Sequence, residues 1–206
     1  MKKICIYGKG GIGKSTVVAN VAAAAARDGK RVMVVGCDPK ADTTRVLVHG
    51  RMETILDAHA RTGGVGLTLA DVAREGAFGV LCMESGGPRA GEGCAGKGIA
   101  LALQDIRQLG VVEAFQPDLI LFDVLGDVVC GGFSTPLRAK VADTAYIVTT
   151  SDYMSIYAAN NICGCIRKHA DRGGCRLGGL IFNERSALSD STPVEVFARA
   201  IGSGVI

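Results

Sequence analysis

Short apolar runs alternate with longer helical patterns along almost the whole chain. Runs with the length and composition of buried strands occupy residues 4–7, 31–36, 80–83, 119–123, 145–149 and 177–182. Patterns typical of helices occupy residues 15–27, 98–109, 153–170 and 193–200. Because strands that alternate with helices pair in parallel and are covered by those helices, this order predicts an α/β fold with a mostly parallel sheet and helices on both faces.

The sequence contains no internal repeat and no linker, so we expect a single domain over residues 1–206. The last residues, "IGSGVI", have the pattern of the beginning of a further strand. A sheet of this kind is not expected to end on an incomplete strand. We therefore expect a further C-terminal segment to belong with this chain.

The 206 residues are 48% hydrophobic and 21% charged, which excludes a disordered chain and allows one sizeable core. The net charge of +3 is small and aromatic residues make up only 5%, so nothing indicates a nucleic-acid partner. No apolar run reaches the roughly 18 residues that span a membrane, and the N-terminus lacks the pattern of a signal peptide. These features predict a cytoplasmic protein with no membrane partner, in which the eight cysteines stay reduced.

The stretch "YGKGGIGKST", residues 7–16, fits two phosphate-binding patterns. Gly8, Gly10 and Gly13 satisfy G-x-G-x-x-G, the fingerprint of dinucleotide-binding folds. The same stretch satisfies G-x-x-x-x-G-K-S, the phosphate-binding loop (P-loop) of nucleoside triphosphatases. Both patterns place phosphates at a helix N-terminus, where unpaired N–H groups and the helix dipole attract anions. The residues expected to contact the nucleotide are Gly8, Lys9, Gly10, Gly11, Gly13, Lys14, Ser15 and Thr16.

Three residues favour the triphosphatase. Lys14 suits the β- and γ-phosphates, and the Ser15 hydroxyl suits Mg²⁺. The run "LILFDVLGD" ends an apolar strand with Asp123, the acid that a triphosphatase places near Mg²⁺, and Gly126 follows it. A dehydrogenase would use Asp38, after the second strand, to bind ribose, but it does not need this combination of lysine, serine and distant aspartate.

A second lysine, Lys9, lies within the loop, where one subunit does not need it to hold phosphates. In a face-to-face dimer it would reach the nucleotide of the partner subunit, as an arginine finger supplied in trans does. The alternative is a solvated surface lysine, and the spacing alone does not distinguish the two.

Six of the eight cysteines lie in or beside predicted strands and helices, where a small buried side chain is the ordinary interpretation. They are Cys5, Cys37, Cys82, Cys163, Cys165 and Cys175. Cys94, in "GEGCAGKG", and Cys130, in "DVVCGG", differ because glycines surround them. Backbone N–H groups that approach closely stabilise a thiolate and tune an iron–sulfur cluster.

Two cysteines are half of the four that a [4Fe–4S] cluster needs, so a two-fold dimer would supply the set, two from each chain. The alternatives are two loop thiols or a regulatory disulfide. Asp123, Gly126, Asp127 and Cys130 also fall within one short stretch. If the chain at Gly126 moves with the γ-phosphate, Cys130 moves too, which predicts electron transfer gated by ATP.

Five segments, "GKGGIGKST", "GCDPKADTTR", "ESGGPRAGEGCAGKG", "FDVLGDVVCGGF" and "YAANNI", closely resemble the nitrogenase iron protein family. The resemblance implies a P-loop NTPase fold and an ATP-dependent reductase. In that family a homodimer shares one [4Fe–4S] cluster and binds one MgATP in each subunit. The dimer docks transiently to a nitrogenase or nitrogenase-like catalytic component and passes low-potential electrons to it one at a time as ATP is hydrolysed.

The resemblance also assigns individual residues. Cys94 and Cys130 correspond to the cluster ligands, and Lys9 to a lysine that acts across the dimer. Lys14, Ser15 and Asn183 correspond to residues that contact the phosphates, magnesium and adenine.

Two switch segments follow from the same resemblance. Asp38, Lys40 and Asp42 match the first, and Asp123 and Asp127 match the second, near magnesium and the attacking water. Both Asp38 and Asp127 are candidates for the residue that positions this water.

This sequence departs from the family's usual pattern, and these departures leave the identity of the catalytic partner open. The family usually has arginine at position 97, on the docking face, where some members are ADP-ribosylated; Lys97 keeps the charge but loses the planar fork. Other relatives serve tetrapyrrole synthesis or cleave alkyl sulfides. A non-redox class of ATPases that positions DNA or division proteins shares Lys9 but needs neither Cys94 nor Cys130. Chains of the iron protein family also continue beyond Ile206.

Overall fold

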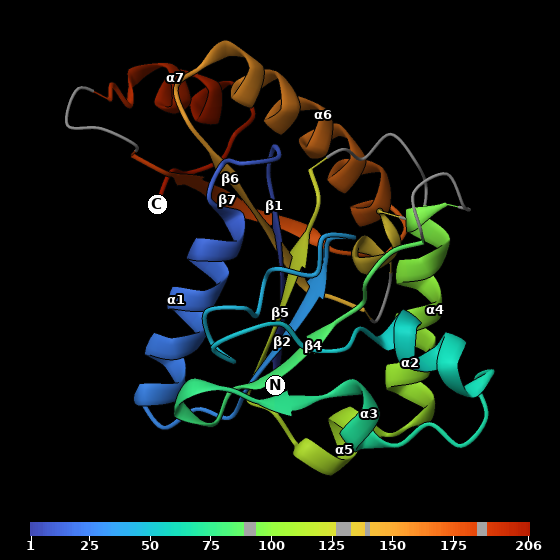
Figure 1. Cartoon of the computed structure of the whole chain (residues 1–206). Helices are drawn as coiled ribbons and strands as arrows, with labels where there is room; N and C mark the ends of the chain where they lie inside the picture. The colour runs from blue at the N-terminus through green and yellow to red at the C-terminus, as the bar shows by residue number, and fades with distance from the viewer. Residues whose placement is uncertain (89–93, 127–132, 139–140, 185–188) are drawn as a thin grey trace. The chain divides into compact units, whose positions relative to one another are not determined.

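The computed structural model describes residues 1–88, 94–126, 133–138, 141–184 and 189–206 (Figure 1). Two predicted site residues, Asp127 and Cys130, lie outside the described residues. The chain divides into two compact units: the first contains Met1–Lys2 and Ser15–Asp123, and the second contains Lys3–Lys14 and Val124–Ile206. In the described part of the chain, no helix is both long and apolar enough to cross a membrane.

The strands of the first unit form a small sheet with a buried centre. In order across the sheet they are β3 (Arg74–Glu75), β4 (Leu81–Glu84), β2 (Val32–Cys37) and β5 (Leu119–Val124). β2 and β4 are parallel, in a register that pairs Gly36 with Glu84, whereas β3 is antiparallel to β4. Every residue of β2 is buried, as a continuous apolar run predicts for a strand covered on both faces.

Helices connect these strands along the chain. They are α1 (Lys14–Arg27), α2 (Ile55–Thr62), α3 (Leu69–Val72), α4 (Ala95–Gln108) and α5 (Val111–Phe115), with a 3₁₀ turn, η1, at Ala77–Gly79. The Thr54 hydroxyl caps α2 by accepting a hydrogen bond from the Asp57 N–H at 3.1 Å. α2 packs on α4, and His59 Nδ1 lies 2.9 Å from Asp105 Oδ2 of that helix.

The second unit contains the parallel strands β1 (Lys2–Tyr7), β6 (Thr144–Thr149) and β7 (Arg176–Phe182), in that order. A 3₁₀ turn, η2 (Thr135–Leu137), precedes β6, and the helices are α6 (Tyr153–Ala170) and α7 (Thr192–Ala200). α6 packs along β6 and β7 (Figure 1). The final residues extend this sheet, because Val205 pairs in parallel with Leu180 of β7.

The described residues thus form seven strands whose pairings are mostly parallel, accompanied by helices. This arrangement confirms the predicted α/β class. β3, α2, α3 and α5 were not predicted from the sequence. β3, α3 and α5 have five residues or fewer, too few to show a hydrophobic period, whereas α2 has a buried face, with Ile55 and Ala58, that the sequence analysis missed.

Candidate functional site

The glycine loop has the backbone conformation of an anion-binding loop. Gly8, Gly11 and Gly13 have φ values of 149°, 72° and 101°, in the region that favours glycine. Lys14 is only 5% exposed, and its ammonium group donates to the Lys9 carbonyl oxygen at 3.4 Å. α1 begins at Lys14, so the loop ends at a helix N-terminus, as the P-loop pattern predicts.

Asn183 supports this loop from within the second unit. It follows β7, and its backbone N–H donates to the Thr149 carbonyl at 2.9 Å. Its side-chain Nδ2 donates to the Ile12 carbonyl at 2.7 Å, and a Cβ on Gly13 would overlap this amide. The structure therefore gives Asn183 a role in fixing the loop, and its contact with adenine stays a prediction.

The predicted magnesium residues lie together in the first unit. Asp123, at the end of β5, is 1% exposed, and its Oδ2 accepts hydrogen bonds from the Ser15 hydroxyl at 2.6 Å and the Thr43 hydroxyl at 2.8 Å. Hydroxyl and carboxylate oxygens are the protein ligands that Mg²⁺ prefers. Thr43 was not predicted, although its position directly after Asp42 in the first switch was the available signal.

The first switch follows β2. Asp38 is 8% exposed, and its Oδ1 accepts a hydrogen bond from the Lys40 N–H at 2.9 Å, whereas Lys40 and Asp42 are exposed. Ser15, Thr16, Asp42 and Thr43 line one part of a hollow of about 660 Å³. Lys14 and the glycines of the loop do not line this hollow, so it marks open space beside Ser15 and the first switch rather than the phosphate site itself.

A buried carboxylate that the sequence did not single out lies beside this cluster. Glu84 ends β4 with an exposure of 0%, and its Oε1 accepts hydrogen bonds from both the N–H and the hydroxyl of Thr44. Burial raises the pKa of Glu84 to about 7, and the carboxylates of Asp123 and Asp42 also raise it, against the hydrogen bonds from Thr44. The pKa of the neighbouring Cys37 thiol is raised for the same reason, chiefly by burial.

The raised pKa of Glu84 makes stability depend on pH. The folded chain keeps this proton up to a pH of about 7, whereas the unfolded chain loses it near 4.5, so stability falls as pH rises through this window. The shift corresponds to about 3 kcal/mol of unfolding free energy. We expect Glu84→Gln, which does not titrate, to remove this loss of stability with rising pH. Urea unfolding from pH 5 to 8 should then show the variant gaining stability relative to wild type as pH rises, and parallel profiles would contradict this.

Lys9 has a partner within its own chain. Its ammonium group lies 3.9 Å from Asp152 Oδ1, and both side chains are about half exposed. The hydroxyls of Ser155 and Thr150 lower the pKa of Asp152 to about 2, with Lys9 contributing least. An exposed pair at this distance contributes little stability, so Lys9 remains able to exchange this contact for another.

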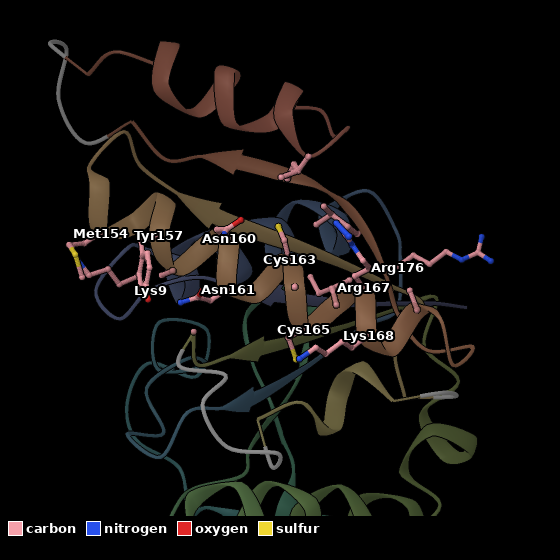
Figure 2. Close-up of a pocket in the computed structure, with 17 residues that line it drawn as sticks. Lys9, Met154, Tyr157, Asn160, Asn161, Cys163, Cys165, Arg167, Lys168 and Arg176 are labelled. Carbon is pink, nitrogen blue, oxygen red and sulfur yellow. The ribbon is translucent and has the colours of Figure 1, made fainter.

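A hollow of about 880 Å³ runs along α6 in the second unit (Figure 2). Figure 2 shows Lys9 with Met154 and Tyr157 toward one end, and the basic side chains of Arg167, Lys168 and Arg176 toward the other. Met154 and Tyr157 are both 52% exposed. The Lys9 end of the hollow therefore combines a cation with accessible apolar side chains.

Among the described cysteines, two differ from the interpretation of the sequence. Cys5, Cys37, Cys82 and Cys175 are buried, and Cys94 is exposed at the position that precedes α4. Cys163 and Cys165 are only half-buried on α6, so the interpretation of these two as buried small side chains was wrong. Burial nevertheless raises the pKa of Cys163 to about 11.

Cys94 fits a cluster ligand, because its thiol is accessible at the N-terminus of a helix, where a thiolate is favoured. Among the described residues, no group of three or more histidine, cysteine, aspartate or glutamate side chains has the arrangement of a metal site. A cluster held by Cys94 would thus need ligands from beyond the described part of this chain.

Comparisons with known proteins agree with these observations. Residues 2–206 match the family described as 4Fe-4S iron sulfur cluster binding proteins, NifH/frxC family. The chain is 52% identical over 206 residues to a nitrogenase iron protein from Methanococcus voltae, covering 100% of this chain and 74% of that protein. It is 46% identical over 218 residues to nitrogenase iron protein 2 of Methanothermococcus thermolithotrophicus, covering 100% of this chain and 75% of that protein.

Solved structures show the same fold at low identity. The ParA family ATPase from Chlorobium tepidum superposes with a TM-score of 0.69 at 20% identity, covering 100% of this chain and 83% of that one. The complex of the cell division proteins MinC and MinD from Aquifex aeolicus gives a TM-score of 0.68 at 19% identity. The match covers 100% of this chain and 79% of that one. These similarities confirm the P-loop NTPase fold.

Proposed function

The chain belongs to the NifH/frxC family of 4Fe-4S iron–sulfur cluster binding proteins, and on this premise we propose that it is the ATP-dependent reductase of a nitrogenase or nitrogenase-like enzyme. Its activity is that of an oxidoreductase, as the reductase component of such a system. The dependence of this reductase on ATP rests on one observation: the hydroxyls of Ser15 and Thr43 both donate hydrogen bonds to the buried carboxylate of Asp123. This is an arrangement that a magnesium–nucleotide complex needs.

Residues of the glycine loop and of the two switch segments would bind ATP and position it for hydrolysis. Lys14 neutralises charge on the β- and γ-phosphates, while the loop N–H groups hold them at the start of α1. Ser15 would bind magnesium, and the Asp123 carboxylate, which accepts hydrogen bonds from the Ser15 and Thr43 hydroxyls, would hold both hydroxyls in place. Asp38 or Asp127 positions the attacking water; Asp38 lies buried at the end of β2.

The cluster supplies one-electron redox chemistry when bound, and the chain contributes Cys94 and Cys130 to it. Thiolate ligation needs reduced cysteines, which accords with the cytoplasmic location expected from the sequence. Because two cysteines from each chain complete the cluster, the functional form is a homodimer.

Lys9 supports a two-fold interface on the α6 side of the second unit. It shares a hollow with the exposed side chains of Met154 and Tyr157, and its contact with Asp152 is weak. A partner subunit placed there would cover the apolar side chains and bring Lys9 to the opposite nucleotide. Lys9 would then exchange Asp152 for the partner's phosphates, which links dimer geometry to ATP.

The docking surface for the catalytic component includes the first turn of α4. Cys94 and Lys97 are both exposed there, so a positive charge lies beside the cluster ligand. The catalytic component is that of nitrogenase or of a relative that reduces tetrapyrroles or cleaves alkyl sulfides. A non-redox positioning ATPase is the alternative, since proteins of the MinD and ParA kind share the fold.

Anaerobic purification tests the proposal. The dithionite-reduced dimer should give the electron paramagnetic resonance signal of a reduced [4Fe–4S] cluster, and MgATP should alter that signal. ATP hydrolysis should accelerate when the co-purified catalytic component is added. An intact, reconstituted dimer that hydrolyses ATP but yields no cluster signal would instead favour the positioning ATPase.

A further inference from the structure

The side chain of Glu84 occupies a space that the fold keeps open for it. Gly36 is its partner in the parallel pairing of β2 and β4. A Cβ on Gly36 would overlap Glu84 Oε2 and would lie 2.7 Å from Glu84 Cδ and 2.9 Å from the Thr43 hydroxyl. Glycine at position 36 therefore lets a carboxylate enter the end of the sheet, where burying it is costly.

The cost of burial is only partly offset. Glu84 Oε1 accepts hydrogen bonds from the Thr44 N–H at 2.6 Å and from the Thr44 hydroxyl at 2.7 Å. Glu84 Oε2 has no hydrogen-bond partner among the residues that the structure describes. A carboxylate kept in such a place holds Thr44 in one position more firmly than an apolar residue would.

Thr44 directly follows Thr43, whose hydroxyl contacts the Asp123 carboxylate. The Thr43 hydroxyl donates to Asp123, and the next residue donates twice to Glu84, so two carboxylates hold consecutive residues of the first switch. The Thr44 carbonyl also accepts the N–H groups of Leu47 and Val48 and so starts the following turn. Any displacement of Thr43 that accompanies nucleotide binding must therefore change the contact with Glu84.

On its other side, Glu84 leads into the segment that precedes Cys94. The Ser85 N–H donates to the Gly36 carbonyl at 2.8 Å, so this segment starts against β2. A Cβ on Gly87 would lie 2.5 Å from Pro39 Cβ, which shows that the segment also lies directly on the first switch. The stretch from Glu84 to Gly87 is thus packed against the first switch at both ends.

We propose that Glu84 is a positioning residue that transmits the state of the first switch, through Thr44, to the stretch from Glu84 to Gly87, which precedes Cys94 in the sequence. The nucleotide would then act on the cluster through Cys94 as well as through the second switch and Cys130. This inference rests on the proposed function, because it requires both MgATP and the cluster. The contacts that carry it all lie within the first unit.

The test measures the rate at which bipyridyl removes cluster iron from the intact dimer, with and without MgATP. In the wild type, MgATP should accelerate this removal. Thr44→Val keeps the shape of the side chain but removes one hydrogen bond to Glu84, and Glu84→Leu removes the oxygen that accepts both hydrogen bonds. Each should reduce the MgATP-dependent acceleration by about fivefold or more, while the Kd for MgATP changes by less than about threefold.

Two control variants distinguish the loss of a positioning contact from general damage to the fold. Glu84→Gln retains an oxygen acceptor for Thr44 and should keep the acceleration near the wild-type value. Glu75→Gln makes the same change at an exposed position on β3 and should have no effect. If Glu84→Leu does not fold, Thr44→Val decides the question.

Full acceleration in Thr44→Val, or a loss that only matches weaker MgATP binding, would overturn the proposal while leaving the proposed function intact. A wild-type dimer with a cluster but no MgATP effect would overturn both. The two failures are therefore distinguishable in the same set of measurements.

Discussion

Replacement of Cys94 by serine should abolish cluster assembly while leaving MgATP binding unchanged. The Cys94 side chain is exposed at the N-cap of α4, where the proposed function needs a ligand of the shared cluster, and a serine hydroxyl does not replace a thiolate ligand for iron. We expect the iron content of the reconstituted dimer to fall at least about tenfold. Iron and sulfide analysis, the electron paramagnetic resonance signal and a nucleotide-binding titration check both parts of this expectation.

Cys165→Ser is the matched control, because Cys165 is half-buried on α6 and has no assigned role in ligation. It should assemble a normal cluster. Reductase activity that survived in Cys94→Ser would show that the ligand assignment is wrong. A parallel loss of MgATP binding would point to misfolding instead, and circular dichroism would detect it.

A second large effect is expected at Gly126. This residue is buried, and a Cβ there would overlap the Gly8 carbonyl oxygen and lie 2.8 Å from the Lys9 backbone nitrogen. Gly126→Ala must therefore push the chain after β5 away from the glycine loop. Because catalytic geometry tolerates little displacement, ATP hydrolysis should fall about 100-fold, as measured by phosphate release.

The same variant should lose the effect of MgATP on the cluster, since Cys130 follows Gly126 closely in the sequence. Gly50→Ala is the control, because nothing lies within 4 Å of a Cβ at that position, and it should hydrolyse ATP normally. Normal hydrolysis by Gly126→Ala would mean that the close packing at Gly8 is not needed for activity.

Much of the fold was predictable because long elements carry their own signal. The sequence predicts a helix over 153–170, and α6 spans Tyr153–Ala170; the apolar run at 31–36 became β2 at Val32–Cys37. Such segments bury a face with a fixed period, so composition and spacing identify them. The four-residue helix α3 depends instead on a capping box between Thr68 and Asp71, which no hydrophobic pattern reveals.

The nucleotide-binding residues were predictable because phosphate chemistry needs them at fixed spacing along the chain. The glycine loop with Lys14 and Ser15 is local, and a strand that ends in Asp123 is a recognisable pattern, so sequence by itself determined the P-loop and the family. Cys94 and Cys130 stood out for the same local reason, since glycines flank them.

Only the tertiary structure decided which distant groups meet. The hydroxyls of Ser15 and Thr43 share one carboxylate oxygen because β5 ends beside the start of α1 and the first switch. Glu84 reaches Thr44 because β4 is paired in register with β2, and Gly36 leaves the space. Contacts of this kind depend on strand order and side-chain burial, which are properties of the assembled chain, so no local pattern in the sequence contains them.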